Sequence, residues 1–562
     1  MIEFVSANLA PIMFGVIIFF LLSGFPVAFS LSACGLFFGF IGLELGLIPS
    51  ALFQALPLRV FGIMQNDTLL AIPFFTLMGL VLERSGMAED LLETVGQVFG
   101  PVRGGLALAV IFVGALLAAT TGVVAASVIS MGLISLPIML RYGYSRPIAA
   151  GVITASGTLA QAIPPSLVLI VMADQLGRSV GDMYKGAMIP ALSLVGLYAL
   201  FVIGLAIFRP KMVPALPPEA LAYREPDGGA GLRSLGVLAI LVIAASVALG
   251  QNYGAVLTWL EGREVLPPAL DETIVVALTF GTIFALVLAL INRGLRLGLL
   301  SRIAERVTFV LIPPLILIFL VLGTIFLGVA TPTEGGAMGA VGAMIMAVAR
   351  RRLDFKTLVQ ALESTARLSI FVMFILVGST IFSFVFTAID GQVWVEHLFD
   401  RLPGGQLGFL LFVNVVIFFL GCFIDFFEIA FILLPLLGPV AENMGIDLIW
   451  FGVIIAINLQ TSFLTPPFGF ALFYLRSVAP NSAYIDRVTK KHIEGMKTGD
   501  IYRGSVAFVL IQLVMVGLVI AFPGLVSGGL DKKTEVDLDK IQIQAPPGGA
   551  GGWGEESGGA WQ

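Results

Sequence analysis

Long apolar segments dominate the chain and are separated by short polar or glycine-rich stretches. Many of them approach the roughly 20 residues that an α-helix needs to cross the hydrocarbon core of a bilayer. Residues 11–42 fit two spans with one Gly-Phe-Pro interruption. Further spans are predicted near residues 234–250, 272–292, 307–327, 333–349, 368–388 and 505–525. The pattern therefore predicts an all-α polytopic membrane protein that lies in a lipid bilayer.

One set of sequence landmarks occurs twice in the chain, in the same order. Gly181-Asp182-Met183-Tyr184-Lys185-Gly186 matches Gly499-Asp500-Ile501-Tyr502-Arg503-Gly504, and Pro164-Pro165 matches Pro466-Pro467. We therefore expect two related halves, at residues 1–210 and 307–527, joined by a linker at 211–306 that holds two spans. Residues 528–562 are glycine-rich and charged, a composition that predicts a disordered tail.

Each half is predicted to contain a re-entrant helical hairpin followed by a broken helix. The hairpins lie near residues 106–140 and 406–438, and the broken helices near 149–173 and 449–474. A hairpin returns to its own side, so each half crosses the membrane five times, for about 12 spans with the linker. An odd number of crossings makes the two halves inverted relative to each other, and inverted repeats are typical of secondary transporters.

The distribution of basic residues predicts the orientation in the membrane. Most Lys and Arg residues lie in four loops, at 209–233, 293–306, 350–367 and 476–503, which the positive-inside rule places in the cytoplasm. The loops at 251–272 and 390–401 are poor in basic residues and are expected outside. Because the number of crossings is even, both termini are predicted to be periplasmic.

Composition supports a membrane carrier and argues against other functions. Hydrophobic residues make up 58% of the chain and charged residues 12%, with a mean hydropathy of +1.02. Nucleic acid is not an expected partner, and the two cysteines, both in apolar segments, do not indicate a disulfide. The sequence has no Gly-Lys-Ser/Thr phosphate loop and no metal-binding histidine pattern, so we do not expect an enzyme. Transport must then be driven by a gradient or by a separate subunit.

The interrupted segments are the best candidates for a functional site. Proline removes a backbone donor and blocks the helix, which frees carbonyl oxygens upstream, and such oxygens suit a hard cation such as sodium. The first half offers the stretches 119–122 and 156–165, and the second half offers 421–428 and 458–467. A kink that serves only packing is the alternative. Asp425 and Glu428 would share one helix face at membrane depth, as functional acids or as members of a structural ion pair.

Another apolar run is interrupted at Thr331-Pro332-Thr333-Glu334. Gly24-Phe25-Pro26-Val27 is its counterpart in the first half. Both are interpreted as helix junctions, with a cavity-lining role for Thr331, Thr333 and Glu334 as the sharper alternative.

Taken together, these motifs resemble the large membrane subunit of the TRAP transporters, the tripartite ATP-independent periplasmic carriers (DctM-like permeases). The resemblance covers roughly residues 11–525. It rests on the two motifs above that begin with Gly-Phe-Pro and Gly-Asp-Met, and on Ile72-Pro73-Phe74-Phe75-Thr76-Leu77-Met78-Gly79, Ala162-Ile163-Pro164-Pro165-Ser166, Ala330-Thr331-Pro332-Thr333-Glu334 and Leu464-Thr465-Pro466-Pro467-Phe468-Gly469.

The resemblance implies an elevator-type carrier, similar to the ion transporter superfamily, in the bacterial inner membrane. Such a carrier imports organic acids with sodium, receives them from a periplasmic substrate-binding protein, and works with a small four-helix membrane subunit (DctQ-like). By motif match, one sodium site is expected at Thr120, Thr121, Gly122, Ala160, Ile163 and Pro165, and a second at Asp425, Ser462, Thr465 and Pro467. Candidate substrate-binding residues are Gln161, Thr331, Thr333, Gln460 and Thr461.

The chain departs from the usual family pattern in two places and leaves one alternative open. Serines usually follow the glycine of the first hairpin, where this chain has Val123 and Val124, and glycine is usual at Ala160 and Ser462. Carbonyl ligation survives these changes. The additional length at 210–271 resembles a branch associated with mannitol or chloroaromatic compounds, although 2-oxo acids and hydroxy acids such as lactate fit equally well. A sodium/dicarboxylate-type symporter that acts without a binding protein is the alternative, and a membrane scaffold is a third hypothesis.

Overall fold

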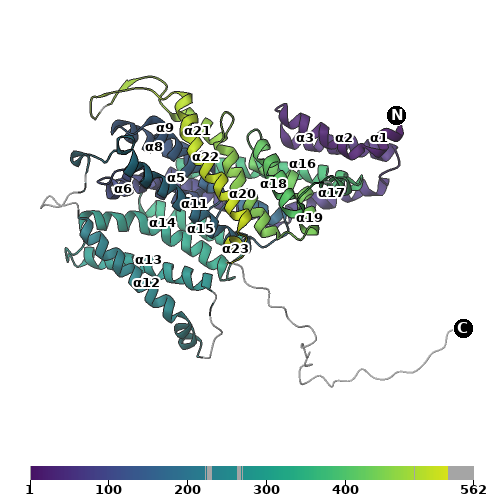
Figure 1. Cartoon of the computed structure of the whole chain (residues 1–562). Coiled ribbons are helices and arrows are strands. Elements are labelled where there is room, and N and C mark those ends of the chain that lie inside the picture. Colours follow the sequence, from purple (N-terminus) through teal and green to yellow (C-terminus); the bar gives the residue numbers. More distant parts are fainter. Residues whose placement is uncertain are drawn as a thin grey trace, which may run out of the picture. The chain divides into compact units, whose positions relative to one another are not determined.

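The computed structural model describes residues 2–528 apart from 222, 224–230, 263–267, 269, 401 and 487. Nearly all of the predicted tail, residues 529–562, therefore lies outside the described residues. The predicted all-α fold is confirmed, since the described elements are helices except for one antiparallel pair, β1 (Tyr484–Ile485) and β2 (His492–Ile493). Figure 1 shows the arrangement of the helices.

The helices occur in three groups along the chain. The first group is α1 (Ile2–Ala7), α2 (Leu9–Leu22), α3 (Val27–Glu44), η1 (Ser50–Ala55), α4 (Leu56–Met64), η2 (Asp67–Leu70), α5 (Ala71–Arg84), α6 (Met87–Phe99), α7 (Gly105–Thr121), α8 (Val124–Arg141), α9 (Arg146–Thr158), η3 (Leu159–Gln161), α10 (Leu167–Gln175) and α11 (Val180–Phe208). The linker holds η4 (Pro210–Met212), η5 (Pro218–Ala220), α12 (Leu232–Glu261) and α13 (Leu270–Gly294). The last group is α14 (Arg302–Phe326), α15 (Pro332–Ala349), α16 (Phe355–Ala388), α17 (Gly391–Asp400), α18 (Gly405–Leu420), α19 (Phe426–Asn443), α20 (Leu448–Leu464), α21 (Phe470–Val478), α22 (Thr498–Ala521) and α23 (Gly524–Ser527).

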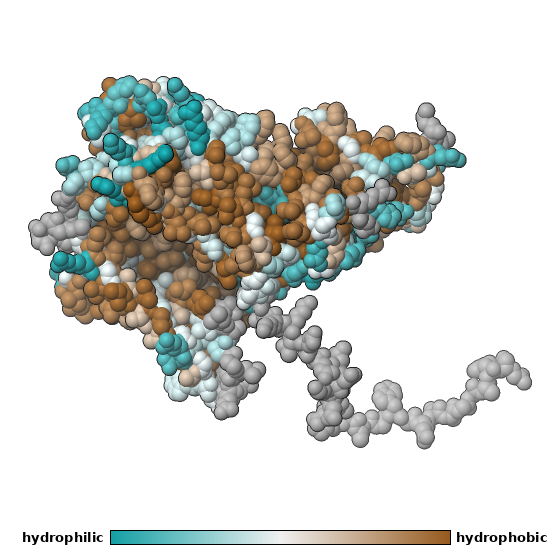
Figure 2. Space-filling view, in the orientation of Figure 1, coloured by the Kyte–Doolittle hydropathy of each residue, from teal (hydrophilic) through white to brown (hydrophobic). Residues whose placement is uncertain are grey.

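Long apolar helices make this a membrane protein. Among the described residues, nine helices are long and apolar enough to cross a membrane, or up to ten if the bent pair Ser50–Met64 and Asp67–Arg84 forms one span. The helix α2 and the segments α7, α18 and α20 are apolar but shorter. Apolar residues cover much of the surface along the helices, whereas hydrophilic residues gather over the connection between α21 and α22 (Figure 2). This distribution suits helices whose sides face lipid and whose connections face water.

Two short helices were not predicted from the sequence. The stretch 390–401, expected to be a loop, forms α17, and α6 occupies the equivalent place in the first half. Their apolar residues are confined to one side, as with Val395 and Phe399 on α17, which are buried. Because a search for continuous apolar runs passes over such amphipathic segments, the loop prediction was wrong here.

Corresponding helices of the first and last groups make equivalent contacts with the opposite group. By their order in the chain, α3 corresponds to α15 and α5 corresponds to α16. The structure packs α3 against α16, and α15 against α5. The hairpin helix α8 packs against α21, just as its counterpart α19 packs against α10. This is the contact pattern expected of two related halves, while the direction in which each half faces stays a prediction.

The halves approach each other most closely where α9 meets α22. A Cβ atom on Gly504 would lie 2.0 Å from the carbonyl oxygen of Pro147 and 2.9 Å from the nitrogen of Gly151. A Cβ atom on Gly151 would lie 2.2 Å from the carbonyl oxygen of Gly504. Only glycine at both positions allows the two backbones to pack at this distance.

The linker adds a peripheral pair of helices. The helices α12 and α13 pack against each other, and both contact α14. Before α12, the chain is tied to the first half by backbone hydrogen bonds from Gly104 to Val213 (2.9 Å) and from Leu216 to Gly100 (2.8 Å).

Candidate functional site

The first hairpin meets the first broken helix at its tip. The helices α7 and α8 are joined through Gly122, which has a φ of +59° and ends α7 in the left-handed conformation. A Cβ atom at Gly122 would lie 3.3 Å from the backbone nitrogen of Leu167, the first residue of α10. Along the stem, a Cβ atom on Gly157 would lie 2.3 Å from a methyl group of Val128. The sequence prediction that places Gly122 beside this break is therefore consistent with the geometry.

The first break lies between η3 and α10, and all residues from 151 to 170 are buried. Pro164 and Pro165 have no N–H to offer the carbonyl oxygens of Ala160 and Gln161. The hydroxyl of Ser166 donates to the Gln161 carbonyl oxygen (2.9 Å) and accepts from the N–H of Val168 (3.2 Å), so it begins α10. The carbonyl oxygen of Ala160 therefore receives neither a helical N–H from Pro164 nor the hydroxyl of Ser166.

The second half repeats this arrangement. A Cβ atom on Gly421, at the end of α18, would lie 2.7 Å from Cβ of Ser462 on α20. At the hairpin tip, the ring of Phe423 packs on Phe468 with a centroid separation of 4.9 Å. The carbonyl oxygen of Ser462 accepts from the N–H of Thr465 (3.1 Å) and from Cys422 Sγ (3.8 Å). Each hairpin tip therefore contacts the broken helix of its own half.

The side-chain hydroxyls at the two breaks are turned toward backbone carbonyls. Thr120 donates to Leu117 (3.0 Å), Ser462 to Asn458 (3.2 Å) and Thr465 to Thr461 (2.9 Å). Since each hydroxyl proton is occupied, the lone pairs of its oxygen are free to contact a cation. Hydroxyl and carbonyl oxygens are the donor types that a hard cation such as sodium prefers, and each break offers both. Thr121 is the last residue of α7, and the predicted roles of Ile163, Pro165 and Pro467 rest on their backbone oxygens.

Asp425 has a local structural task that the sequence analysis did not identify. It is the N-cap of α19, where its Oδ1 accepts from the N–H of Phe426 (2.7 Å). In return, Glu428 Oε2 accepts from the N–H of Asp425 (3.0 Å), which completes a capping box. No hydrogen bond within the described residues joins Asp425 to Ser462, Thr465 or Pro467. Its assignment to the second sodium site stays a prediction.

Asp425 and Glu428 line a cavity of about 480 Å³ between the second hairpin and the α2–α3 junction. The walls are mostly aromatic and apolar, and include Phe25, Pro26, Phe371, Phe374 and Phe423. The two carboxyl groups are the acidic residues on this wall. An acid beside a cavity at membrane depth has solvent or ligand access that a sealed structural ion pair would lack.

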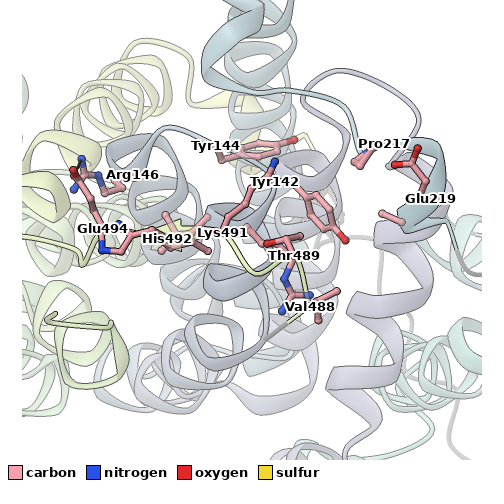
Figure 3. A pocket seen from close by; sticks show the side chains of 15 residues that line it. Tyr142, Tyr144, Arg146, Pro217, Glu219, Val488, Thr489, Lys491, His492 and Glu494 are labelled. Carbon is pink, nitrogen blue, oxygen red and sulfur yellow. Dashed lines mark ion pairs between the residues drawn. The ribbon is translucent and has the colours of Figure 1, made fainter. Parts of the chain in front are cut away.

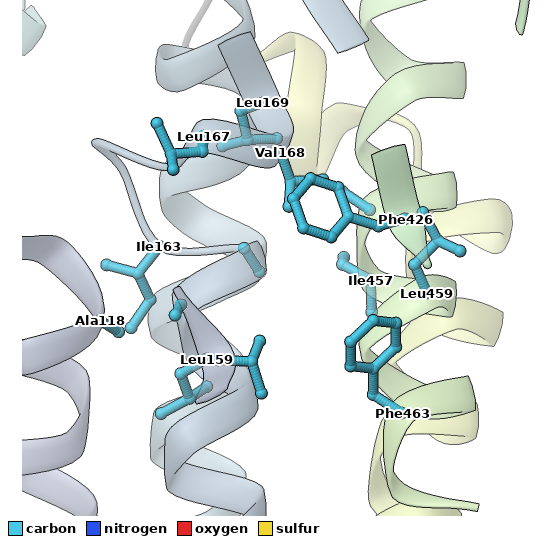
Figure 4. Packing of buried hydrophobic residues seen from close by; sticks show 14 of the residues in the cluster. Ala118, Leu159, Ile163, Leu167, Val168, Leu169, Phe426, Ile457, Leu459 and Phe463 are labelled. Carbon is cyan, nitrogen blue, oxygen red and sulfur yellow. The ribbon is translucent and has the colours of Figure 1, made fainter. Parts of the chain in front are cut away.

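The candidate substrate residues divide into two groups. Gln161, Gln460 and Thr461 are fully buried at the breaks, and both amide atoms of Gln161 are without a hydrogen-bond partner in the described part of the chain. Gln460 Nε2 donates to the hydroxyl of Tyr198 (3.5 Å), which also accepts from Gln512 Nε2 (2.7 Å). Apolar side chains of both broken helices, such as Leu159, Ile163, Leu459 and Phe463, are buried in the same region (Figure 4).

Thr331 and Thr333 lie at the start of α15 instead of at a break. Thr331 is the N-cap and forms a capping box with Glu334, and Thr333 Oγ1 donates to the carbonyl oxygen of Asp67. The interpretation as a helix junction is therefore confirmed. Both residues are exposed or half-exposed in the structure, which leaves them outside the buried polar group at the breaks.

Sequence reasoning missed several polar contacts near the breaks. Asn66 Nδ2 donates to Asp174 Oδ1 (2.6 Å), which joins the η2 region to the end of α10. Tyr198 and Gln512 are both fully buried and link α11, α20 and α22. A lone glutamine in the apolar run of α22 was a signal available in the sequence, because a buried amide requires a partner.

A cavity of about 780 Å³ lies away from the breaks (Figure 3). It is lined by the end of α8, the start of α9, η5 and the connection between α21 and α22. Arg141 Nε contacts Asp486 Oδ1 (3.0 Å), and Arg146 contacts Glu494 (2.7 Å). These ion pairs hold the connection that contains β1 and β2 against the base of the first hairpin.

Asp486→Asn is expected to destabilise the protein at neutral pH. Desolvation raises the pKa of Asp486, but hydrogen bonds from Thr489 and the neighbouring Arg141 outweigh it and lower the pKa to about 2. A depressed native pKa stabilises the fold above the unfolded value near 3.8, and this contribution is lost as pH falls toward 2. Melting temperatures of both proteins between pH 7 and pH 3 should therefore converge as the pH falls. A constant difference would contradict the assignment.

The sequence profile described as "Tripartite ATP-independent periplasmic transporter, DctM component" matches residues 14–525. The chain belongs to this family. The resemblance to TRAP large subunits is thereby confirmed, and members of the family are transporters rather than enzymes. They are multi-pass proteins of the inner membrane.

Curated relatives of this TRAP permease differ in their named substrates. The C4-dicarboxylate TRAP transporter large permease protein DctM of Pseudomonas aeruginosa is 28% identical over 84% of this chain and 88% of its own length. The sialic acid TRAP transporter large permease protein SiaM of Vibrio cholerae is 24% identical over 82% and 87%. The isethionate TRAP transporter permease protein DctMQ of Oleidesulfovibrio alaskensis is 25% identical over 85% of this chain and 62% of its own length.

TRAP large permeases work with a small membrane subunit and a periplasmic binding protein. Among solved structures, the YdaH transporter of Alcanivorax borkumensis is 16% identical in sequence. The match covers 84% of this chain and 88% of the YdaH chain. The TM-score of this match is 0.46.

Proposed function

We propose that this chain is the membrane permease subunit of a sodium-coupled, binding-protein-dependent secondary importer of small organic acids. The observation that carries the proposal is the contact of each hairpin tip with a proline-broken helix, at Gly122 with Leu167 and at Gly421 with Ser462. Backbone and hydroxyl oxygens lie at both breaks, of which the first is buried and the second is partly exposed, and oxygen donors suit sodium. Irregular backbone at membrane depth is tolerated where it lines such a site.

The substrate class is inferred from the chemistry of the relatives and of the breaks. The substrates named for the three relatives are a C4-dicarboxylate, sialic acid and isethionate, all organic acids. In this chain, the buried amide of Gln161 lacks a partner within the described residues, and the amides and hydroxyls of Gln460 and Thr461 lie at the second break. An uncharged polar site of this kind, with bound sodium beside it, suits a small carboxylate such as a 2-oxo or hydroxy acid.

Sodium would act at both breaks by joining a hairpin tip to its broken helix. The cation would draw carbonyl oxygens of the break and the C-terminal end of α7 together, because both carry partial negative charge. In the proposed elevator mechanism, the hairpins and broken helices move as one body past α2–α5 and α14–α16. Asn66 with Asp174 would form one contact between these two groups, to be broken as the carrier moves.

The proposed complex includes a small four-helix membrane subunit and a periplasmic binding protein, with both termini of this chain in the periplasm. The even number of expected crossings and the positions of the basic loops support this orientation.

Uptake is expected to require both sodium and the binding protein. The large and small subunits would be reconstituted together in liposomes and supplied with radiolabelled lactate, pyruvate and succinate. Each substrate is tested with and without a sodium gradient, and with and without the binding protein encoded nearest to this gene. Sodium-dependent uptake that needs no binding protein would instead support a stand-alone symporter. Uptake that is equal in sodium-free buffer would contradict sodium coupling.

A further inference from the structure

Two matched tyrosines each contact the backbone at the second proline of a Pro-Pro break or directly after it. The hydroxyl of Tyr184, on α11, donates to the carbonyl oxygen of Ser166 (3.5 Å). The hydroxyl of Tyr502, on α22, donates to the carbonyl oxygen of Pro467 (3.2 Å). Tyr184 is fully buried, whereas Tyr502 is half-buried. The two acceptors are offset by one position, since Ser166 follows the second proline of its break and Pro467 is the second proline of its own.

These tyrosines occupy the same position of the repeated Gly-Asp-X-Tyr-Lys/Arg-Gly motif, in the first turns of α11 and α22. The connecting chains nevertheless differ. Tyr184 lies 18 residues after its acceptor, whereas Tyr502 lies 35 residues after its own, because the connection between α21 and α22 contains β1 and β2. The contact is therefore not a by-product of one local chain path. The tyrosine contact recurs although the number of residues between the tyrosine and its acceptor differs.

The closing glycine of the same motif places each helix against the other half. A Cβ atom on Gly186 would lie 3.0 Å from a methyl group of Ile449 on α20, and one on Gly504 would lie 2.0 Å from the carbonyl oxygen of Pro147 on α9. Each motif therefore contacts its own break through a tyrosine and the opposite broken helix through a glycine. This close packing fixes the helix from which the tyrosine reaches the break.

A broken helix lacks the hydrogen bonds that would otherwise hold its backbone in one conformation. The carbonyl oxygens before the prolines have lost their donors, and those after the prolines begin the next helix. A hydroxyl that fixes the backbone at or after the second proline limits how far the preceding carbonyl groups of Ala160 and Ser462 can turn. Oxygens held in one arrangement bind a cation more tightly than oxygens that must first be ordered.

We propose that Tyr184 and Tyr502 are positioning residues for the two breaks, and that each holds its break in the conformation that receives the cation. This inference rests on the proposed sodium coupling and assigns a role to the repeated motif. The two tyrosines differ in expected weight. Water can replace the hydroxyl of the half-buried Tyr502, but it cannot reach the buried Tyr184, so the loss of Tyr184 has the larger effect.

Tyr184→Phe is expected to raise the half-saturating sodium concentration for uptake roughly 2- to 10-fold, which corresponds to about 0.5–1.5 kcal/mol for one hydrogen bond. The maximal rate at saturating sodium should be retained, and Tyr502→Phe should produce a smaller increase. Amide hydrogen exchange of residues 159–168 is measured on the same proteins and should be faster in Tyr184→Phe than in the unchanged protein.

Tyr144→Phe is the matched control. Its hydroxyl is also buried and bonded to the backbone, but it accepts from the N–H of Leu106 at the base of the first hairpin (3.2 Å). It should lower the melting temperature without changing the sodium dependence. Equal sodium dependence and unchanged exchange at 159–168 in Tyr184→Phe would overturn the proposal. If the unchanged protein shows no sodium dependence, the proposed function fails, and the exchange measurement alone then decides the role of the tyrosine.

Discussion

Gly504→Ala is expected to destabilise the protein more than a methyl group added at Gly499 or Gly517, the other glycines of α22. The new Cβ atom would lie 2.0 Å from the carbonyl oxygen of Pro147 and 2.9 Å from the nitrogen of Gly151, and both of these atoms belong to the backbone of α9. Backbone cannot rotate away as a side chain can, so the helices must separate. Overpacking of a tight interface typically costs about 1–3 kcal/mol and occasionally more. The measurement is the melting temperature of the purified protein, with uptake per folded molecule.

Gly517→Ala on the same helix is the control for this change. A Cβ atom there meets nothing within 4 Å, so the substitution changes helix propensity without changing packing. Alanine is favoured over glycine in a helix by roughly 0.8–1.0 kcal/mol, and the variant should therefore be as stable as the unchanged protein or more so. If both variants melted alike, the close approach of α9 and α22 would not be needed for stability.

Asp425→Asn is expected to reduce uptake at least roughly tenfold while leaving the melting temperature nearly unchanged. Asparagine caps a helix about as well as aspartate, so the bond to the N–H of Phe426 can be kept. The negative charge beside the cavity is lost, and a carboxylate at membrane depth is retained at a cost of a few kcal/mol by insertion scales. Such a cost indicates a role in cation or substrate handling.

Two further variants separate the cap from the charge. Asp425→Ala removes both, and should add a loss of roughly 1 kcal/mol of stability to the loss of uptake. Asp354→Asn makes the same exchange at an exposed N-cap on α16, where the carboxylate accepts from the N–H of Thr357 (2.8 Å). It should change neither property. A large fall in stability with normal uptake per folded molecule in Asp425→Asn would show that the carboxylate is purely architectural.

The hairpins and breaks could be located from the sequence because their signals are local. Proline has no N–H whatever surrounds it, so Pro164 and Pro466 mark interrupted helices without any knowledge of the fold. Apolar length likewise marks the stems of the hairpins to within a few residues of α7, α8, α18 and α19. The amphipathic α6 and α17 gave no such signal to a search for apolar runs.

The role of Asp425 was accessible but was interpreted differently. An aspartate followed three residues later by a glutamate is also a capping-box pattern, as the structure shows at α19, whereas helical spacing alone predicts two acids on one helix face. The contacts of Tyr184 and Tyr502 could not be predicted from the sequence. Their motif was visible, but the acceptors depend on how α11 and α22 pack against helices distant in sequence.

The helical pair α12 and α13 lengthens the chain without belonging to either of the two related halves. The sequence predicts that α12 and α13 cross the membrane out and back, and such a pair would leave the direction of the second half unchanged whether it is present or not. Outside the pair itself, the main packing partner of α12 and α13 is α14. Contacts among the other helices hold the rest of the bundle together (Figure 1). Chain length is therefore a poor guide to the working parts of this carrier. The linker at residues 211–306 is a natural place to insert a fluorescent protein or to remove a segment.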